Sequence, residues 1–201
     1  MSINQIVYQV GIPEQYRETA AELYEEAFGK KLGVAIKDKE KRLSILTSTL
    51  MLEYAIGAFS NKNLIGIAGF QTSDGSLTSG IGYRDLLSQL GFIKGNWAAL
   101  IFSIYERKPK PMELVMDGIS VHSLGRGKGI GTNLLAEIKA LAKNKGYRQI
   151  RLDVIDINHK AKILYERVGF ETVKTESYPF LKGLLGFSGS ETMVFKISEN
   201  V

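Results

Sequence analysis

Gly125-Arg126-Gly127-Lys128-Gly129-Ile130-Gly131-Thr132 is the stretch that decides how this chain folds. It follows an apolar run that ends at Val121 and precedes an amphipathic run that begins at Ile130. This order predicts a strand, a glycine-rich turn and a helix. The first N–H groups of a helix have no partner within it, and the helix dipole makes that end positive. Together with Arg126 and Lys128, these N–H groups predict a binding site for an anionic group.

The segments on either side of the glycine stretch indicate a strand-helix-strand unit. A strand is expected over residues 112–121, a helix from Ile130 to about Lys145 that ends at Gly146, and a second strand over residues 149–155. Such a crossover is right-handed, with parallel strands. Strict alternation along the first strand would put Glu113, Val115, Asp117 and Ile119 on one face and Leu114, Met116, Gly118 and Ser120 on the other. Two carboxylates on one face of a central strand need a cavity or partners, so this face is a candidate site.

The rest of the chain shows helical and strand patterns without repeats or linkers. Glutamates of the first helix, among them Glu25 and Glu26, are expected on a solvated face. Residues 72–110 form an insertion with two helices, a candidate lid or wall for an acceptor site. The loop over residues 178–187 is apolar, with Phe180, Leu181, Leu184, Leu185 and Phe187. The expected strands are 6–10, 52–59, 64–71, 170–175 and 191–197, and the expected helices are 15–28, 39–50, 83–90, 96–107 and a short one capped by Asn158 and ended by Gly169.

Length and composition indicate one globular domain over residues 1–201. The chain has no cysteine, which excludes disulfides and thiolate metal sites and fits a reducing cytoplasm. No metal-ligand spacing joins His122 and His159, so no metal is expected. The net charge of +5 comes from scattered basic residues, a pattern that disfavours nucleic acid as the partner. The most apolar window, residues 97–105, is too short to span a bilayer, so no membrane association is expected.

Two familiar phosphate-binding loops do not fit the glycine stretch. Counted from Gly127, the dinucleotide fingerprint would have its third glycine where Thr132 stands. A Walker A loop would have Ser or Thr after its lysine, whereas Gly129 follows Lys128.

Arg126-x-x-Gly129-x-Gly131 resembles the Arg/Gln-x-x-Gly-x-Gly/Ala signature of the GNAT superfamily of N-acetyltransferases. Asn158-x-x-Ala161-x-x-Leu164-Tyr165-Glu166-x-x-Gly169-Phe170 resembles the second part of that family's coenzyme A signature. The resemblance implies an α/β (α+β) fold with a central, mixed, mostly antiparallel twisted sheet and helices on both faces. The helical pair at 72–110, before the fourth strand, departs from the family's usual pattern.

The same resemblance implies acetyl-CoA as cosubstrate. Backbone N–H groups over residues 126–132 would hold its pyrophosphate, and the strand end at Ile119, Ser120 and Val121 would pair with the pantetheine arm. The cofactor-binding residues implied are Ile119, Ser120, Val121, Arg126, Gly127, Lys128, Gly129, Ile130, Gly131, Thr132, Asn158 and Leu164.

Three residues are candidates for the chemistry. Tyr165 resembles the family tyrosine that protonates the departing CoA thiolate, a role that suits a neutral phenol. Glu113 resembles in position the general base of histone-acetylating members, and Asp117 is its rival on the same strand. Either carboxylate could instead pair with a buried Arg or Lys.

The resemblance therefore implies acetyl transfer to an amine of a small molecule or peptide by direct attack. A catalytically silent acyl-CoA sensor is the alternative, and self-association into a homodimer is left open.

Overall fold

The computed structural model of the protein describes residues 5–105, 108–179 and 182–198. The described residues form a seven-stranded sheet with the order β1-β2-β3-β4-β5-β7-β6. β4 and β5 are parallel, as the crossover predicts, and all other neighbours are antiparallel. The strands are β1 (Val7–Val10), β2 (Ala55–Ser60), β3 (Asn63–Gln71), β4 (Glu113–Val121), β5 (Gln149–Ile155), β6 (Glu171–Ser177) and β7 (Gly189–Lys196).

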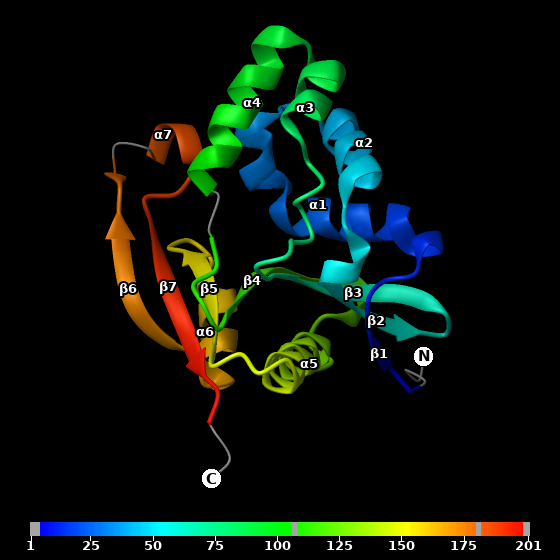
Figure 1. Cartoon of the computed structure of the whole chain (residues 1–201), viewed down its shortest axis with the longest axis vertical. Coiled ribbons are helices and arrows are strands. Elements are labelled where there is room, and N and C mark those ends of the chain that lie inside the picture. The colour runs from blue at the N-terminus through cyan, green and yellow to red at the C-terminus, as the bar shows by residue number, and fades with distance from the viewer. Residues whose placement is uncertain (1–4, 106–107, 180–181, 199–201) are drawn as a thin grey trace.

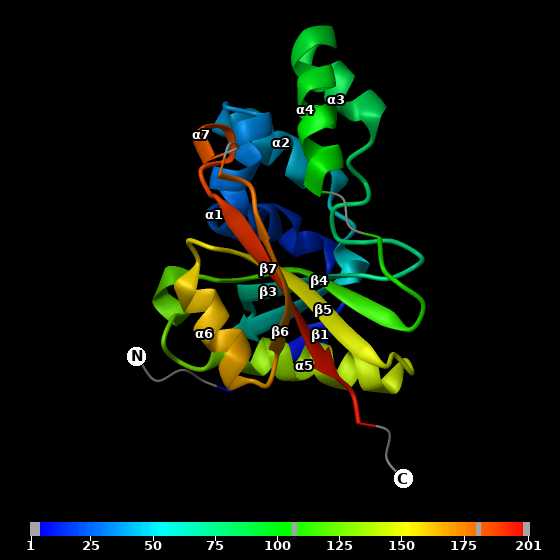
Figure 2. The same cartoon turned by 90° about the vertical axis from the view of Figure 1, so that its left-hand side faces the viewer.

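Helices cover both faces of the sheet (Figure 1, Figure 2). α5 and α6 lie on one face and α1 and α2 on the other, where α3 and α4 stand beyond them as a helical hairpin. The pair expected within residues 72–110 is therefore present, although α4 begins at Phe92 rather than at Asn96. The helices are α1 (Arg17–Ala35), α2 (Lys39–Thr49), α3 (Tyr83–Leu90), α4 (Phe92–Tyr105), α5 (Ile130–Asn144), α6 (His159–Arg167) and α7 (Lys182–Leu185).

Local sequence signals account for the ends of these elements. The Asp38 carboxylate accepts from the N–H groups of Glu40 and Lys41 at the start of α2, as predicted. Gly146 ends α5 in a left-handed conformation with φ +77°. The β2–β3 hairpin turns at Asn61 and Lys62, whose positive φ values match the tight two-residue turn that suits a twisted hairpin.

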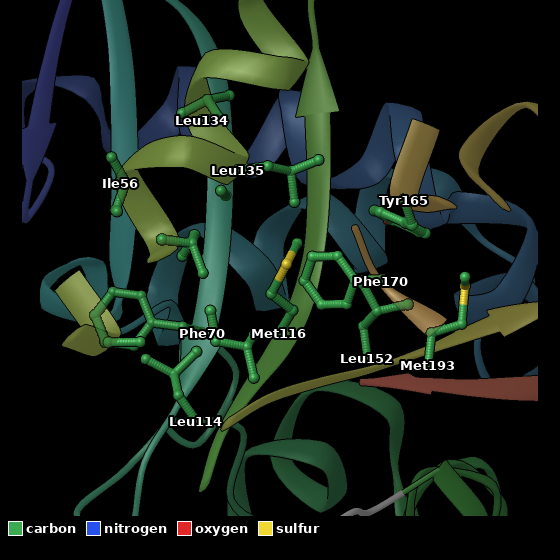
Figure 3. Packing of buried hydrophobic residues seen from close by; sticks show 14 of the residues in the cluster. Ile56, Phe70, Leu114, Met116, Leu134, Leu135, Leu152, Tyr165, Phe170 and Met193 are labelled. Atoms are coloured by element: carbon green, nitrogen blue, oxygen red, sulfur yellow. The ribbon is translucent and has the colours of Figure 1, made fainter. Parts of the chain in front are cut away.

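The largest core lies between the sheet and the α5/α6 layer (Figure 3). Leu134, Leu135 and Ile138 of α5 pack there against Leu114 and other buried side chains of the central strands. A second core joins α1 and α2 to the opposite face of β2 and β3, and a third joins α3 and α4 to the ends of α1 and α2. Each face of the sheet therefore has its own apolar layer.

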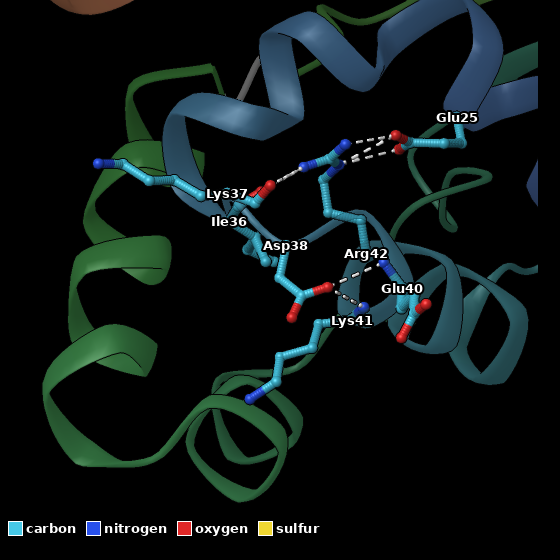
Figure 4. A network of polar contacts seen from close by, with 7 residues as sticks. All are labelled: Glu25, Ile36, Lys37, Asp38, Glu40, Lys41 and Arg42. Carbon is cyan, nitrogen blue, oxygen red and sulfur yellow. Dashed lines mark hydrogen bonds and ion pairs between the residues drawn. The ribbon is translucent and has the colours of Figure 1, made fainter.

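A buried ion pair holds α1 to α2 (Figure 4). The Arg42 guanidinium donates to both oxygens of Glu25 at 2.6–3.1 Å and to the carbonyls of Ile36 and Lys37 at 2.7 and 2.8 Å. Gly29 leaves room for this carboxylate, since a Cβ there would lie 2.5 Å from Glu25 Oε1. The solvated face expected for the first helix is thus wrong at Glu25, which is 6% exposed. Its partner comes from another helix, which helical periodicity does not reveal.

Replacing Arg42 by Leu should lower the free energy of unfolding by about 3–5 kcal/mol, because it leaves the Glu25 carboxylate buried without its counter-charge. Urea denaturation of the wild type and the variant measures this difference. The matched control is Lys41→Leu, next to Arg42 on α2 but exposed, which should stay within about 0.5 kcal/mol of the wild type. Equal stability of the two variants would contradict a structural role for the pair.

Candidate active site

β4 and β5 separate in the middle of the sheet. The two strands are described throughout, and they pair from Glu113 with Gln149 to Val115 with Arg151. Immediately beyond, β4 carries a β-bulge: Phe70 of β3 pairs with Met116 and Gly69 with Gly118, so Asp117 is the extra residue. We call this point of divergence the fork.

The bulge corrects the expected alternation along β4. Asp117 and Gly118 both face α1, because a Cβ at Gly69 would approach the Asp117 Cβ and a Cβ at Gly118 would meet the Phe28 ring. Ile119 and Val121 instead pack with the α5 side of the sheet. The prediction that Ile119 shares a face with Glu113 and Asp117 is therefore wrong, since the extra residue reverses the face of every later side chain.

The glycine stretch leads from β4 into α5 as expected. Asn133 N–H donates to Gly129 O at 3.0 Å, so the N–H groups of Ile130, Gly131 and Thr132 lie before the first intrahelical bonds. Gly127 and Gly129 have φ values of +76° and +77°, and a Cβ added at either would meet no atom within 4 Å. Their backbone therefore borders open space at the positive end of the helix, a geometry that suits a phosphate.

The two signature segments meet around Gly131. A Cβ at Gly131 would lie 3.5 Å from Leu164, 3.8 Å from Ile119 and 4.0 Å from Val121. The structure thus brings together three of the side chains expected beside the cofactor, from β4 and α6. Ser120 is buried on the strand between them. Asn158 caps α6, its Oδ1 accepting from the Ala161 N–H at 3.3 Å.

The loop before α5 also carries two cationic side chains, Arg126 and Lys128. Arg126 and Lys128 are exposed, and the Arg126 guanidinium donates to Val121 O at 3.1 Å and pairs with Glu26 of α1 at 2.5 Å. Arg167, at the end of α6, donates to Thr132 Oγ1 at 3.4 Å. Arg167 brings a further positive charge to the loop that sequence reasoning missed, although it lies inside the second signature segment.

Tyr165 lies in the main core, 7% exposed, with its ring 6.0 Å from that of Phe170 (Figure 3). Burial raises the pKa of Tyr165 to about 12. The phenol therefore keeps its proton at neutral pH.

Glu113 is closed off from solvent at the start of β4, with 1% of its surface exposed. Its Oε1 accepts from Gln149 Nε2 at 2.7 Å, and its Oε2 accepts from the Lys110 N–H at 3.0 Å. Arg151 Nε lies 3.3 Å from Oε2, an ion pair whose N–H is not aligned for a hydrogen bond. This is the kind of pairing with an Arg that sequence reasoning left open for either carboxylate, although Arg151 is only partly buried, with 14% of its side chain exposed.

Asp117 opens instead onto a cleft of about 680 Å³ on the α1 side of the fork. Its Oδ2 accepts from Thr78 Oγ1 at 3.3 Å. Burial raises the pKa of Asp117, an effect that the nearby Lys31 and the bonds from Thr78 oppose without cancelling. A carboxyl whose pKa is raised toward neutrality is a better proton acceptor than an ordinary one.

Aromatic side chains and two further carboxylates line the same cleft. Asp153 and Glu176 lie on its β5 and β6 side. Of the apolar loop expected at 178–187, Tyr178 and Phe187 contribute to the lining, whereas Phe180, Leu181 and the side chains of Leu184 and Leu185 lie outside what the structure describes. The aromatic lining residues are Tyr24, Phe28, Tyr83, Phe102, Tyr178 and Phe187. Sequence reasoning placed Tyr24 and Phe28 only on a helix face, although their i, i+4 spacing pairs them.

Two other findings apply only to the described residues. They contain no group of three His, Cys, Asp or Glu side chains positioned for a metal ion. None of the helices they form is long and apolar enough to cross a bilayer.

Comparisons with known proteins agree with this geometry. The chain is 41% identical over 66 residues to mouse thialysine N-epsilon-acetyltransferase, a match that spans 33% of this chain and 38% of that protein. An N-acetyltransferase from Staphylococcus aureus superposes with a TM-score of 0.62 at 15% identity, over 97% of this chain and all of its own. The YncA structure from Salmonella typhimurium, solved with its cofactor acetyl-CoA, superposes with a TM-score of 0.59 at 14% identity, over 98% and 97%.

These solved structures share the fold, and the curated relative is matched over little more than a third of its length. The profile of the acetyltransferase (GNAT) family matches residues 16–170, from α1 through the fork to the end of the second signature segment. The chain therefore belongs to the GNAT acetyltransferase family.

Proposed function

We propose that the protein is an acetyl-CoA-dependent N-acetyltransferase whose donor enters the fork from the α5 side and whose acceptor amine enters from the cleft. The observation that carries this proposal is the convergence of open glycine backbone, a helix N-terminus and diverging parallel strands at one place. The N–H groups over residues 126–132 bind the diphosphate, and the β4 edge at Ile119, Ser120 and Val121 holds the pantetheine arm.

The acceptor is a cationic amine, of a small molecule or a peptide. Among the described residues, Asp117, Asp153 and Glu176 line the cleft with one lining cation, Lys31, and Glu176 is paired with Lys174 at 2.8 Å, so the cleft keeps a small excess of negative charge although the whole chain carries a net charge of +5. This local excess of negative charge attracts an ammonium group, and the aromatic walls provide faces for it. The mouse relative is named for thialysine, an amine of this kind.

Asp117 is the base in this proposal. The ammonium must lose a proton before its nitrogen attacks the thioester carbonyl, and Asp117 accepts it at the fork, directly or through water. The nitrogen then bonds to the carbonyl carbon, the carbon–sulfur bond breaks, and Tyr165 protonates the leaving thiolate. The second proton that the nitrogen must lose to become an amide returns to the Tyr165 phenolate, directly or through water. Glu113, held on both oxygens, positions the start of β4 against β5.

A catalytically silent acyl-CoA sensor is the second candidate, because the loop would bind the donor without an acceptor. Free thiol release from acetyl-CoA in a panel of amines separates the two. Tight binding without release for any amine would favour the sensor.

Gly129→Ala should weaken acetyl-CoA binding about tenfold or more, because its Cβ occupies the space that borders the loop N–H groups and lengthens their bonds to the phosphate. Isothermal titration calorimetry measures the affinity. Gly146→Ala is the matched control: Gly146 has the same φ of +77° and an equally open Cβ position, but lies at the other end of α5. If both variants lose affinity equally, backbone strain rather than the phosphate site is the cause.

Asp117→Asn should lower kcat by about 10²–10⁴, the usual contribution of a general base. In the wild type the rate should fall as the pH drops through the raised pKa of Asp117, so the acidic limb lies at higher pH than for an ordinary carboxyl. Steady-state rates across pH test both effects. Glu113→Gln serves as the comparison: it should lower the free energy of unfolding, and its loss of kcat should be smaller than that of Asp117→Asn. A larger loss of kcat in Glu113→Gln than in Asp117→Asn would make Glu113 the base.

Tyr165→Phe should lower kcat by about 10²–10⁴ while the acetyl-CoA affinity stays within twofold, because the ring still packs on Phe170 and only the proton donor is lost. Stopped-flow detection of thiol release and calorimetry give the two quantities. Because the pKa of Tyr165 is about 12, loss of its proton should leave the wild-type rate unchanged below about pH 10. Unchanged kcat in the variant would assign Tyr165 to the core alone.

A further inference from the structure

Phe28 lies directly on the fork. Gly118 has a φ of +149°, and a Cβ added there would lie 2.1 Å from Phe28 Cζ and 2.8–2.9 Å from two other ring atoms. The Phe28 ring therefore occupies the volume into which a side chain on β4 would project. No other residue type than glycine fits at Gly118 without moving this ring.

The ring of Phe28 is held in place from behind. Its centroid lies 4.6 Å from that of Tyr24, one turn earlier on α1, with the two planes tilted by 40°. Tyr24 is 7% exposed and lies close enough to Asp117 for that carboxylate to contribute to the raised pKa of its phenol, after the larger effect of burial. Phe28 itself is half-buried and lines the cleft. The Tyr24–Phe28 pair thus lies beside Asp117.

The path of the donor brings its acyl group to this ring. From Val121, beside the glycine stretch, back to Asp117 the strand runs four residues, or roughly 13 Å of extended chain. A pantetheine arm that follows β4 from a diphosphate at the loop toward the fork ends beside Asp117 and Gly118. An acyl group attached there would lie beside Gly118, where the Phe28 ring occupies the α1 side of the strand.

We infer that Phe28 is the specificity-determining residue for the acyl donor: its ring closes the space beyond the acetyl methyl and excludes longer acyl chains. This inference rests on the proposed donor site. Beyond the donor site itself, the inference specifies which acyl-CoA the site accepts. It also makes α1 part of the pocket for the donor as well as a wall of the acceptor cleft.

The test is the affinity of the full-length protein for acetyl-CoA, butyryl-CoA and CoA, measured by calorimetry for the wild type, Phe28→Leu and Phe28→Ala. The wild type should bind butyryl-CoA at least about tenfold more weakly than acetyl-CoA, since each methylene that a pocket rejects is worth about ten- to 200-fold. Phe28→Ala should bring the ratio close to one and Phe28→Leu to an intermediate value, while the affinity for CoA stays the same in all three.

Phe102→Ala is the matched control, because it removes an aromatic ring from α4, on another wall of the same cleft. It should keep the wild-type ratio of butyryl-CoA to acetyl-CoA affinity. A ratio that is the same in the wild type and both Phe28 variants, or that changes equally in Phe102→Ala, overturns the inference. If Phe28→Ala does not fold, Phe28→Leu decides. Failure of the wild type to bind CoA, acetyl-CoA and butyryl-CoA alike would refute the donor site itself.

Discussion

At Asp117, β4 carries one residue more than β3 can pair, because Phe70 pairs with Met116 and its neighbour Gly69 with Gly118. The extra residue bends the strand and ends its pairing with β5 after Val115. Without this extra residue, β4 and β5 could pair along their whole length, and the hydrogen bonds between them would occupy the facing edges of both strands. The opening in the centre of the sheet, the reversal of faces beyond it and the exposure of Asp117 to the cleft all depend on this one irregularity.

The opening between β4 and β5 is bordered by the start of α5 on one side of the sheet and by two aromatic rings of α1 on the other. On the α5 side, the helix begins at Ile130 directly after two glycines whose left-handed backbone leaves space in front of their N–H groups. On the α1 side, Tyr24 and Phe28 cover the bulge with a pair of rings. The buried Glu25–Arg42 pair fixes α1 against α2, so the helix that bears these rings has little freedom to move away. A charge pair on one face of α1 thereby sets the position of an aromatic wall on another.

The features that sequence predicted are those that depend on neighbouring residues. The cap at Asn158, the start of α5 at Ile130 and the parallel crossover follow from local patterns and from chain connectivity, and all three are confirmed. The bulge could not be read in this way, because nothing in 112–121 distinguishes an extra residue from strict alternation until β3 is placed beside it. The partners of Glu25 and Glu113 could not be identified from local pattern for the same reason, because Arg42 and Arg151 lie 17 and 38 positions away along the chain. The roles assigned to the site residues remain predictions.

Glu113 and Asp117 differ in what their environments leave available. Glu113 accepts from a backbone N–H and a side-chain amide and faces the Arg151 guanidinium, so its negative charge is compensated where it is buried. With both oxygens held by these partners and 1% of its surface exposed, Glu113 is closed off from solvent. Asp117 accepts from a hydroxyl at 3.3 Å and lies near Lys31, and these two do not offset its loss of water. Protonation relieves that cost, and the cleft gives an amine access. Two carboxylates four residues apart on one strand thus differ in environment: Glu113 secures the paired end of the fork, and Asp117, at its opening, is the one whose environment suits the base of the proposed reaction.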